Sequence, residues 1–219
     1  MRHDIERYWG GLAELAQGMP FALLEQAADL LLACQKRGHT VFLLGNGGSA
    51  ATASHFACDL SKGTRTPGVP DFRVVPLTDN VPLITAWAND ASYERIFAEQ
   101  LLALVRPGDV VVAISASGNS PNVLAAVDAA RQAGATTIGL TGKSGGRLRW
   151  LADLTIRVPS TRIELVEDAH LAITHSLCVA LRARLRAATA AADRVLVEAL
   201  AEPVVLTARP VHAGGKARA

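Results

Sequence analysis

The chain has 219 residues, of which half are hydrophobic and 19% are charged, so a substantial core can form and an intrinsically disordered chain is excluded. Its 22 basic and 20 acidic residues give a formal net charge of +2, and only 5% of residues are aromatic. With neither a basic stripe nor a stacking platform, we expect no nucleic-acid partner.

Two further features bear on location. The first residues, MRHDIERYWGGL, carry charges where a signal peptide needs an apolar core, and no run of 18 apolar residues occurs. We therefore expect a cytoplasmic protein without a membrane partner. The three cysteines have no CxxC spacing and lie in helix-like contexts, so we expect buried thiols in a reducing compartment.

Residues 4 to about 38 carry apolar side chains at helical spacing, interrupted by Gly18 and Pro20. We predict a helical hairpin over residues 1–38 that packs on the core. Because such a hairpin is surplus to a single sheet layer, it also suggests packing across a subunit interface.

The stretch from Val41 to Lys62 combines a strand, a glycine turn and a helix. The apolar run VFLL is typical of a strand buried on both faces, and GNGGS follows it. The turn brings backbone N–H groups, Asn46, Gly47 and Ser49 to the start of a helix, an arrangement that suits a phosphate. The spacing is neither GxGxxG nor GxxxxGK[ST], which disfavours a nucleotide. Ordinary packing of the helix on the strand remains the alternative.

The helix after this turn carries His55 and Asp59, four residues apart and hence on one face. The two side chains could bind one metal ion or act as an acid/base pair. In the simpler alternative, Asp59 only orients a histidine on a solvated face.

Apolar runs and helical patterns then alternate to the end of the chain. We predict strands over 73–77, 110–114, 136–140 and 154–159, and helices over 81–88, 122–133 and 162–186. Five strands alternating with helices predict an α/β fold with an open, doubly wound parallel sheet over residues 39–186. Residues 187–219 form an alanine-rich extension, helical to about Ala201 and mobile at its end.

A second polar turn, SASGNS, follows the third strand and supplies Ser115, Ser117 and Ser120. Ligands of such sheets bind at the carboxyl ends of the strands, where both turns fall. Two serine-bearing turns at two helix N-termini favour a phosphomonoester, although serines also commonly cap helices.

The last helix carries Glu167 and His175 about two turns apart, whereas Asp168 and His170 point elsewhere. If this face meets His55 and Asp59, two imidazoles and two carboxylates form a ligand set for a transition metal such as zinc. From the residues alone, a buried polar cluster explains the pattern equally well. A facing carboxylate and histidine could isomerise an aldose and a ketose through an enediol.

Five ordered blocks carry a family resemblance: GNGGSAATASHFACDL, WANDASYERIF, ISASGNSPNV, LTGKSGG and VEDAHLAITHSLC. The sequence resembles the sugar isomerase (SIS) domain family, and within it the sedoheptulose 7-phosphate isomerases, also called phosphoheptose isomerases. The resemblance covers most of the chain, to about Arg186.

The resemblance implies a flavodoxin-like core and a homotetramer with active sites at subunit interfaces. It implies conversion of sedoheptulose 7-phosphate into D-glycero-D-manno-heptose 7-phosphate, a first step of heptose biosynthesis. Carried over by position, it assigns catalysis to Asp59 and His175. Phosphate and sugar contacts fall to Asn46, Gly47, Ser49, Asp90, Ser115, Ser117, Ser120 and Glu167, and a zinc ion falls to His55, Asp59, Glu167 and His175.

Four positions depart from the family pattern: Asp59 replaces a glutamate, Glu167 a glutamine, Ala116 a threonine and Gly63 a basic residue. These departures leave open an isomerase of a different phosphosugar, such as a hexose or pentose phosphate. A second alternative is a non-catalytic SIS protein, either a sugar-phosphate sensor or an adaptor of the DnaA-binding type. The latter should lack the histidine found at position 175.

Overall fold

The computed structural model describes residues 1–201, with side chains described to residue 191; the end of the predicted extension, residues 202–219, lies outside them. Its centre is a five-stranded, all-parallel sheet in the order β2-β1-β3-β4-β5. This confirms the predicted doubly wound α/β fold. The strands are β1 (Thr40–Gly45), β2 (Arg73–Pro76), β3 (Val110–Ile114), β4 (Thr136–Thr141) and β5 (Leu154–Arg157).

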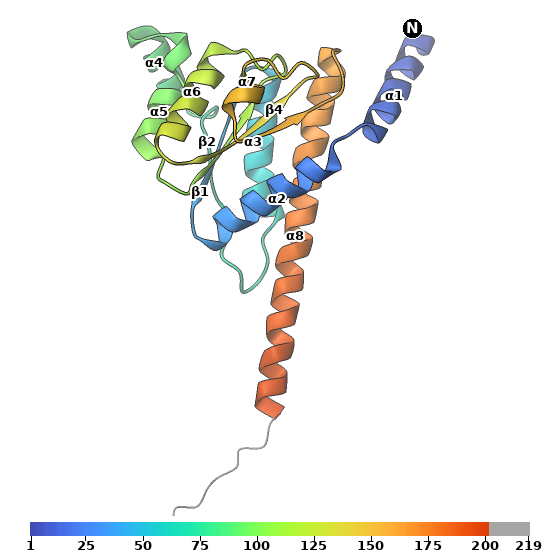
Figure 1. The fold of residues 1–219 in the computed structure, drawn as a ribbon, viewed down its shortest axis with the longest axis vertical. Coiled ribbons are helices and arrows are strands. Elements are labelled where there is room, and N and C mark those ends of the chain that lie inside the picture. The colour runs from blue at the N-terminus through green and yellow to red at the C-terminus, as the bar shows by residue number, and fades with distance from the viewer. Residues whose placement is uncertain (202–219) are drawn as a thin grey trace, which may run out of the picture.

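Helices cover both faces of the sheet (Figure 1). One face carries α2 (Phe21–Lys36), α3 (Gly48–Cys58) and the long α8 (Ile163–Ala201). The other carries α4 (Val81–Asp90), α5 (Ala98–Leu104), α6 (Pro121–Gln132) and the short α7 (Leu148–Leu151). Because β1 is buried on both faces, Leu43 packs into the α2–α3–α8 core while its neighbour Phe42 packs into the other core.

The strand order reverses between β1 and β3, which are paired neighbours. In this register Gly45 lies opposite Ile114, so both strands end at the same edge of the sheet. The GNGGS turn and the SASGNS turn therefore emerge side by side at the topological switch point, where open α/β sheets bind ligands.

The two N-terminal helices are present, but they do not form the predicted hairpin. The helices α1 (Arg2–Gln17) and α2 follow one another almost end to end across α8, and each packs against α8 (Figure 1). The break between them coincides with Gly18 and Pro20, as the sequence indicated. The intervening residues do not reverse the chain direction, so the two helices share few contacts.

An element that the sequence did not predict follows α3 directly. Residues Asp59–Gly63 form a π-helical turn, η1, which continues the axis of α3 with a wider winding. At the other end of the chain, α8 runs on for 39 residues and passes the predicted boundary at 186/187 without interruption. A short 3-10 helix, η2 (Tyr93–Arg95), follows α4.

The cysteines differ from the expectation in one case. Cys34 and Cys178 are buried, but Cys58 at the end of α3 is exposed. Burial raises the pKa of the Cys34 thiol to about 11 and that of Cys178 to about 12, so both thiols are protonated near neutral pH.

Within residues 1–201, no helix has the length and apolar character needed to span a bilayer.

Candidate active site

Three predicted residues meet between α3 and α8. His55 lies on the last turn of α3, Asp59 begins η1, and His175 projects from α8. The two Nε2 atoms of the histidines lie 3.0 Å apart, and Oδ2 of Asp59 lies 3.5 Å from each of them. We call these three residues the His/Asp/His cluster. All three side chains are partly exposed, so the cluster opens to solvent.

The separations within the cluster match those of metal ligands. One ligand atom from each residue lies within 4.8 Å of the others. Two donors bound tetrahedrally at about 2.0–2.1 Å from one zinc ion lie about 3.3 Å apart, close to the three distances here. Two imidazole nitrogens and one carboxylate oxygen also form a donor set that transition metals favour. The cluster can therefore hold a divalent metal through three protein ligands and leave coordination positions open.

Glu167 does not join this cluster. Its carboxylate lies instead against the first residue of α3, where a Cβ atom on Gly48 would be 2.6 Å from Oε1. The predicted four-ligand set is thus reduced to three residues in this structure. The glycine leaves room for the carboxylate at the positive end of the α3 dipole, which attracts anions.

The serine residues of the second turn lie together at the end of β3. Ser115 is 4% exposed, and its Oγ lies 3.1 Å from that of Ser120 and 3.5 Å from that of Ser117. The hydroxyl of Ser120, the N-cap of α6, makes no capping bond, so its main role is not to cap the helix. Ser49, on the first turn of α3, is also buried. The structure thus places hydroxyls and two helix N-termini at one edge, an arrangement that suits an anion.

A reciprocal amide pair joins the two turns. Asn46 and Asn122 each donate from Nδ2 to the other's Oδ1, at 2.9 and 2.8 Å. The exposed Tyr93 also donates its hydroxyl to Oδ1 of Asn46, at 3.2 Å. Asn122 and Tyr93 were not among the predicted site residues, although an asparagine in the first turn after SASGNS and the tyrosine in WANDASYERIF were available signals. Both residues hold the amide of Asn46 at the mouth of the site.

The remaining candidates take different positions. Asp90 is exposed at the end of α4, three residues before Tyr93 in the sequence. Its carboxylate accepts a hydrogen bond from Asn89 at 2.8 Å. Asp168 and His170 point away from the cluster, as predicted. Asp168 accepts a hydrogen bond from Tyr8 on α1, and His170 is buried at 1% exposure.

Taken together, the site offers an anion-binding edge and a cluster of groups that can act as acid or base. Ser49 and His55 stand six residues apart on α3, which corresponds to about 9 Å along the helix axis. This separation is comparable to the length of an extended sugar chain. The arrangement suits a phosphorylated small molecule whose phosphate and reactive carbons bind at opposite ends of α3.

The sequence is similar to that of known proteins over most of the chain. The SIS domain family model matches residues 16–142. A phosphoheptose isomerase of Trichlorobacter lovleyi is 44% identical over 72% of this chain and 80% of its own length. A phosphoheptose isomerase of Rhodospirillum rubrum is also 44% identical, over 71% of this chain and 82% of its own.

The fold is also similar to that of a solved structure. The phosphoheptose isomerase GmhA of Neisseria gonorrhoeae aligns with a TM-score of 0.78 and 31% identity, over 83% of this chain and 98% of its own. The predicted family is confirmed by these matches. The chain belongs to the SIS-domain family and, within it, to the phosphoheptose isomerases, which makes it a sugar-phosphate isomerase.

Proposed function

We propose that this isomerase interconverts sedoheptulose 7-phosphate and D-glycero-D-manno-heptose 7-phosphate. The observation that carries the proposal is the convergence of His55, Asp59 and His175 beside the anion-binding edge. The phosphoheptose isomerase relatives support the choice of a seven-carbon substrate. The carboxylate of Asp59 reaches both histidines although it is one methylene shorter than glutamate.

The phosphate is held without a lysine. Ser115, Ser117 and Ser120 donate hydroxyl protons to its oxygens, and the N-termini of α3 and α6 add backbone N–H groups and positive dipole ends. Ser49 adds a further hydroxyl from the first turn of α3. Asn46, fixed by Asn122, donates its amide to a sugar hydroxyl, and Asp90 accepts one at the rim. These contacts fix which carbons reach the cluster.

The cluster then exchanges protons at two neighbouring carbons. The carboxylate of Asp59 takes the proton from C1 of the ketose, and the carbonyl oxygen at C2 takes a proton from solvent, which gives the enediol. His175 then gives its own proton to C2, and the hydroxyl at C1 passes its proton to solvent and becomes the aldehyde. Asp59 releases its proton to solvent and His175 takes one from it, which restores both groups. In each side chain, one atom faces the cluster and would bind a metal: Oδ2 of Asp59 and Nε2 of His175. The second polar atom, Oδ1 of Asp59 or Nδ1 of His175, would then carry the proton.

We assign a zinc ion to His55, Asp59 and His175. When bound, it supplies a Lewis acid that polarises the carbonyl and stabilises the enediolate. The partly exposed ligands allow the ion to enter, and the open positions suit a catalytic rather than a structural site.

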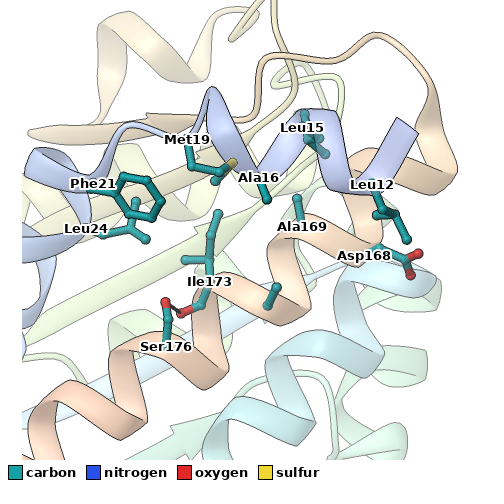
Figure 2. A pocket seen from close by; sticks show the side chains of 11 residues that line it. Leu12, Leu15, Ala16, Met19, Phe21, Leu24, Asp168, Ala169, Ile173 and Ser176 are labelled. Atoms are coloured by element: carbon teal, nitrogen blue, oxygen red, sulfur yellow. Dashed lines mark hydrogen bonds between the residues drawn. The ribbon is translucent and has the colours of Figure 1, made fainter. Parts of the chain in front are cut away.

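We further propose a homotetramer with active sites at subunit interfaces. The α1–α2 segment and α8 border an apolar groove of about 230 Å³ whose lining includes Leu12, Met19, Phe21, Leu24 and Ile173 (Figure 2). Phe21 at its edge is 65% exposed, a large apolar area for a surface side chain. Burial of this groove against another subunit removes that surface from water.

The test is an isomerisation assay in deuterium oxide. Zinc-loaded protein is incubated with sedoheptulose 7-phosphate and, separately, with six- and five-carbon ketose phosphates, and product is followed by proton NMR. We expect the heptulose to be turned over fastest, with deuterium at C2 of the product. Preference for a shorter ketose phosphate would reassign the substrate. Binding of the phosphosugars without turnover of any of them would favour the sensor or adaptor alternative.

A further inference from the structure

The π-helical turn η1 is held by side-chain hydrogen bonds at three points. Ser61 and Thr64 each donate to a carbonyl four residues earlier, those of Ala57 and Leu60, both at 2.6 Å. The third bond comes from outside: Nη1 of Arg182 on α8 donates to the carbonyl oxygen of Gly63 at 3.2 Å. Since π-helical turns are rare and lack the bonding pattern of the α-helix, such additional bonds matter for their shape.

The end of η1 packs beside the carboxylate of Asp59. Gly63 has no side chain, and a Cβ atom added there would lie 3.9 Å from both Cβ and Oδ1 of Asp59, so the backbone of Gly63 is close to this carboxylate. The other carboxylate oxygen, Oδ2, faces His55 and His175. A displacement of Gly63 therefore changes the space on one side of the carboxylate and its direction toward the histidines.

Arg182 lies on the same face of α8 as His175, seven residues or about two turns further along. Between them on this face lies Cys178. Burial is the main reason why the pKa of its thiol is raised; the negative charge of Asp59 raises this pKa further, and the positive charge of Arg182 lowers it. Both charges thus act at the same point of the contact between α8 and η1.

From these contacts we propose that Arg182 is a positioning residue for the His/Asp/His cluster. By tying Gly63 to α8, it sets the separation between Asp59 on η1 and His175 on α8. This inference rests on the proposed function, because it concerns the metal and proton-transfer geometry of the same site. It adds to that function a residue that touches neither the substrate nor the metal.

Loss of Arg182 has two opposite effects on metal binding, one through its charge and one through its hydrogen bond to Gly63. Removing a positive charge near a cation site favours metal binding by simple electrostatics. Loss of the bond to Gly63 releases Asp59 and disfavours it. Mutation of a residue that orients a metal ligand typically lowers metal affinity by about 10- to 100-fold. We therefore expect the loss of position to outweigh the loss of charge.

The experiment is a titration of the metal-free protein with Co²⁺, followed by the visible absorption of the bound ion. We expect Arg182→Met to weaken Co²⁺ binding by at least about 10-fold. Arg182→Lys, which keeps a donor and the charge, should retain most of the affinity. Arg184→Met is the matched control, because Arg184 is two residues away on α8 but pairs with Asp29 and Glu25 on α2.

A second readout separates positioning from substrate binding. With sedoheptulose 7-phosphate, Arg182→Met should lower kcat and leave KM nearly unchanged, because the phosphate contacts are on other elements. Thermal unfolding monitors the fold, and Arg182→Gln replaces Arg182→Met if the latter does not fold.

The outcomes are distinguishable. Co²⁺ affinity of Arg182→Met equal to or above that of the wild type would overturn the inference, as would an equal loss in Arg184→Met. A wild-type protein that binds no Co²⁺ would instead contradict the proposed metal site, and with it this inference.

Discussion

At the N-terminal end of α3, the carboxylate of Glu167 occupies space that Gly48 leaves open. A negative charge at this point offsets the positive end of the helix, on the same turn as the proposed phosphate ligand Ser49. The two anions, the carboxylate and the substrate phosphate, therefore compete for one favourable field.

We expect Glu167→Gln to lower KM for the phosphosugar by about two- to fivefold, the effect of one charge at a helix end. Steady-state kinetics with sedoheptulose 7-phosphate measure it. Glu164→Gln, one turn earlier on α8 and exposed, is the control and should leave KM unchanged. An unchanged KM for Glu167→Gln would contradict this competition, and a higher KM would mean that the carboxylate assists substrate binding.

His170 provides a pH-dependent contribution to stability. Burial lowers the pKa of its imidazole from 6.5 to about 4, and the backbone of Thr141 opposes this shift only in part. Between these two pH values the unfolded chain binds the proton and the folded chain does not. The contribution is therefore fully present above pH 6.5, decreases as the pH falls, and is lost by about pH 4.

We expect His170→Asn to remove this dependence. Between pH 6.5 and pH 5 the wild type should lose about 2 kcal/mol of unfolding free energy more than the variant. Urea denaturation at the two pH values, with a chelator and at fixed protein concentration, gives the difference. His3→Asn, at an exposed position, should behave like the wild type. Parallel pH curves for His170→Asn and the wild type would contradict this assignment.

At the scale of elements, the SASGNS turn depends on close packing against the loop after β4. Gly118 has a φ of +66°, and a Cβ atom there would overlap the carbonyl group of Gly145. Two glycine loops thus touch backbone to backbone, and this contact fixes the turn that carries Ser117 and Ser120.

We expect Gly118→Ala to weaken phosphosugar binding severely and to destabilise the protein by more than the cost of about 1 kcal/mol for a positive φ alone. Gly68→Ala is the control, since Gly68 has a φ of +78° and open space around its Cα. Binding isotherms with inorganic phosphate and thermal unfolding compare the two variants. Equal behaviour would show that the contact with Gly145 does not shape the turn.

Most elements could be predicted from the sequence because local patterns determine them. The apolar run VFLL and its four counterparts are short apolar stretches typical of strands, and their alternation with helices specifies a parallel sheet. The π-helical turn could not be predicted, because Asp59–Gly63 continues a helical pattern and its hydrogen bond to Arg182 spans 119 residues of sequence. The exposed Cys58 similarly depends on which face of α3 meets α8.

The candidate site was predicted as far as spacing along one helix allows. His55 and Asp59 had to share a face, and His175 could reach them only if α8 crossed α3, which the structure shows. Glu167 was assigned to the same set, but the room beside Gly48 directs it to the α3 N-terminus instead. The Asn46–Asn122 pair bridges 76 residues, so the asparagine after SASGNS indicates a polar side chain at the site but not its partner.

At the scale of the whole molecule, the α1–α2 segment lies over α8 and leaves an apolar groove with exposed Phe21 at its edge. We expect Phe21→Asp to shift the protein from tetramers to smaller species, measured by sedimentation. Trp150→Asp is the control, because Trp150 is also highly exposed but lies on α7 at the opposite face of the sheet. A tetramer that persists in Phe21→Asp, or a wild-type monomer, would contradict the proposed interface.

The proposed isomerisation depends on one cluster in which α3 and η1 meet α8, which is far from them in the sequence, to form a proton-transfer site. The most direct measurement is the rate at which deuterium from the solvent enters C2 of the heptose product, followed by NMR for the wild type, Asp59→Asn and His175→Ala. We predict a loss of at least about 100-fold in both variants, with folding retained. His39→Ala is the control, because His39 directly precedes β1 at the amino ends of the strands. This variant should incorporate deuterium at the wild-type rate. Exchange at the wild-type rate in Asp59→Asn or His175→Ala would contradict the assignment of catalysis to this cluster.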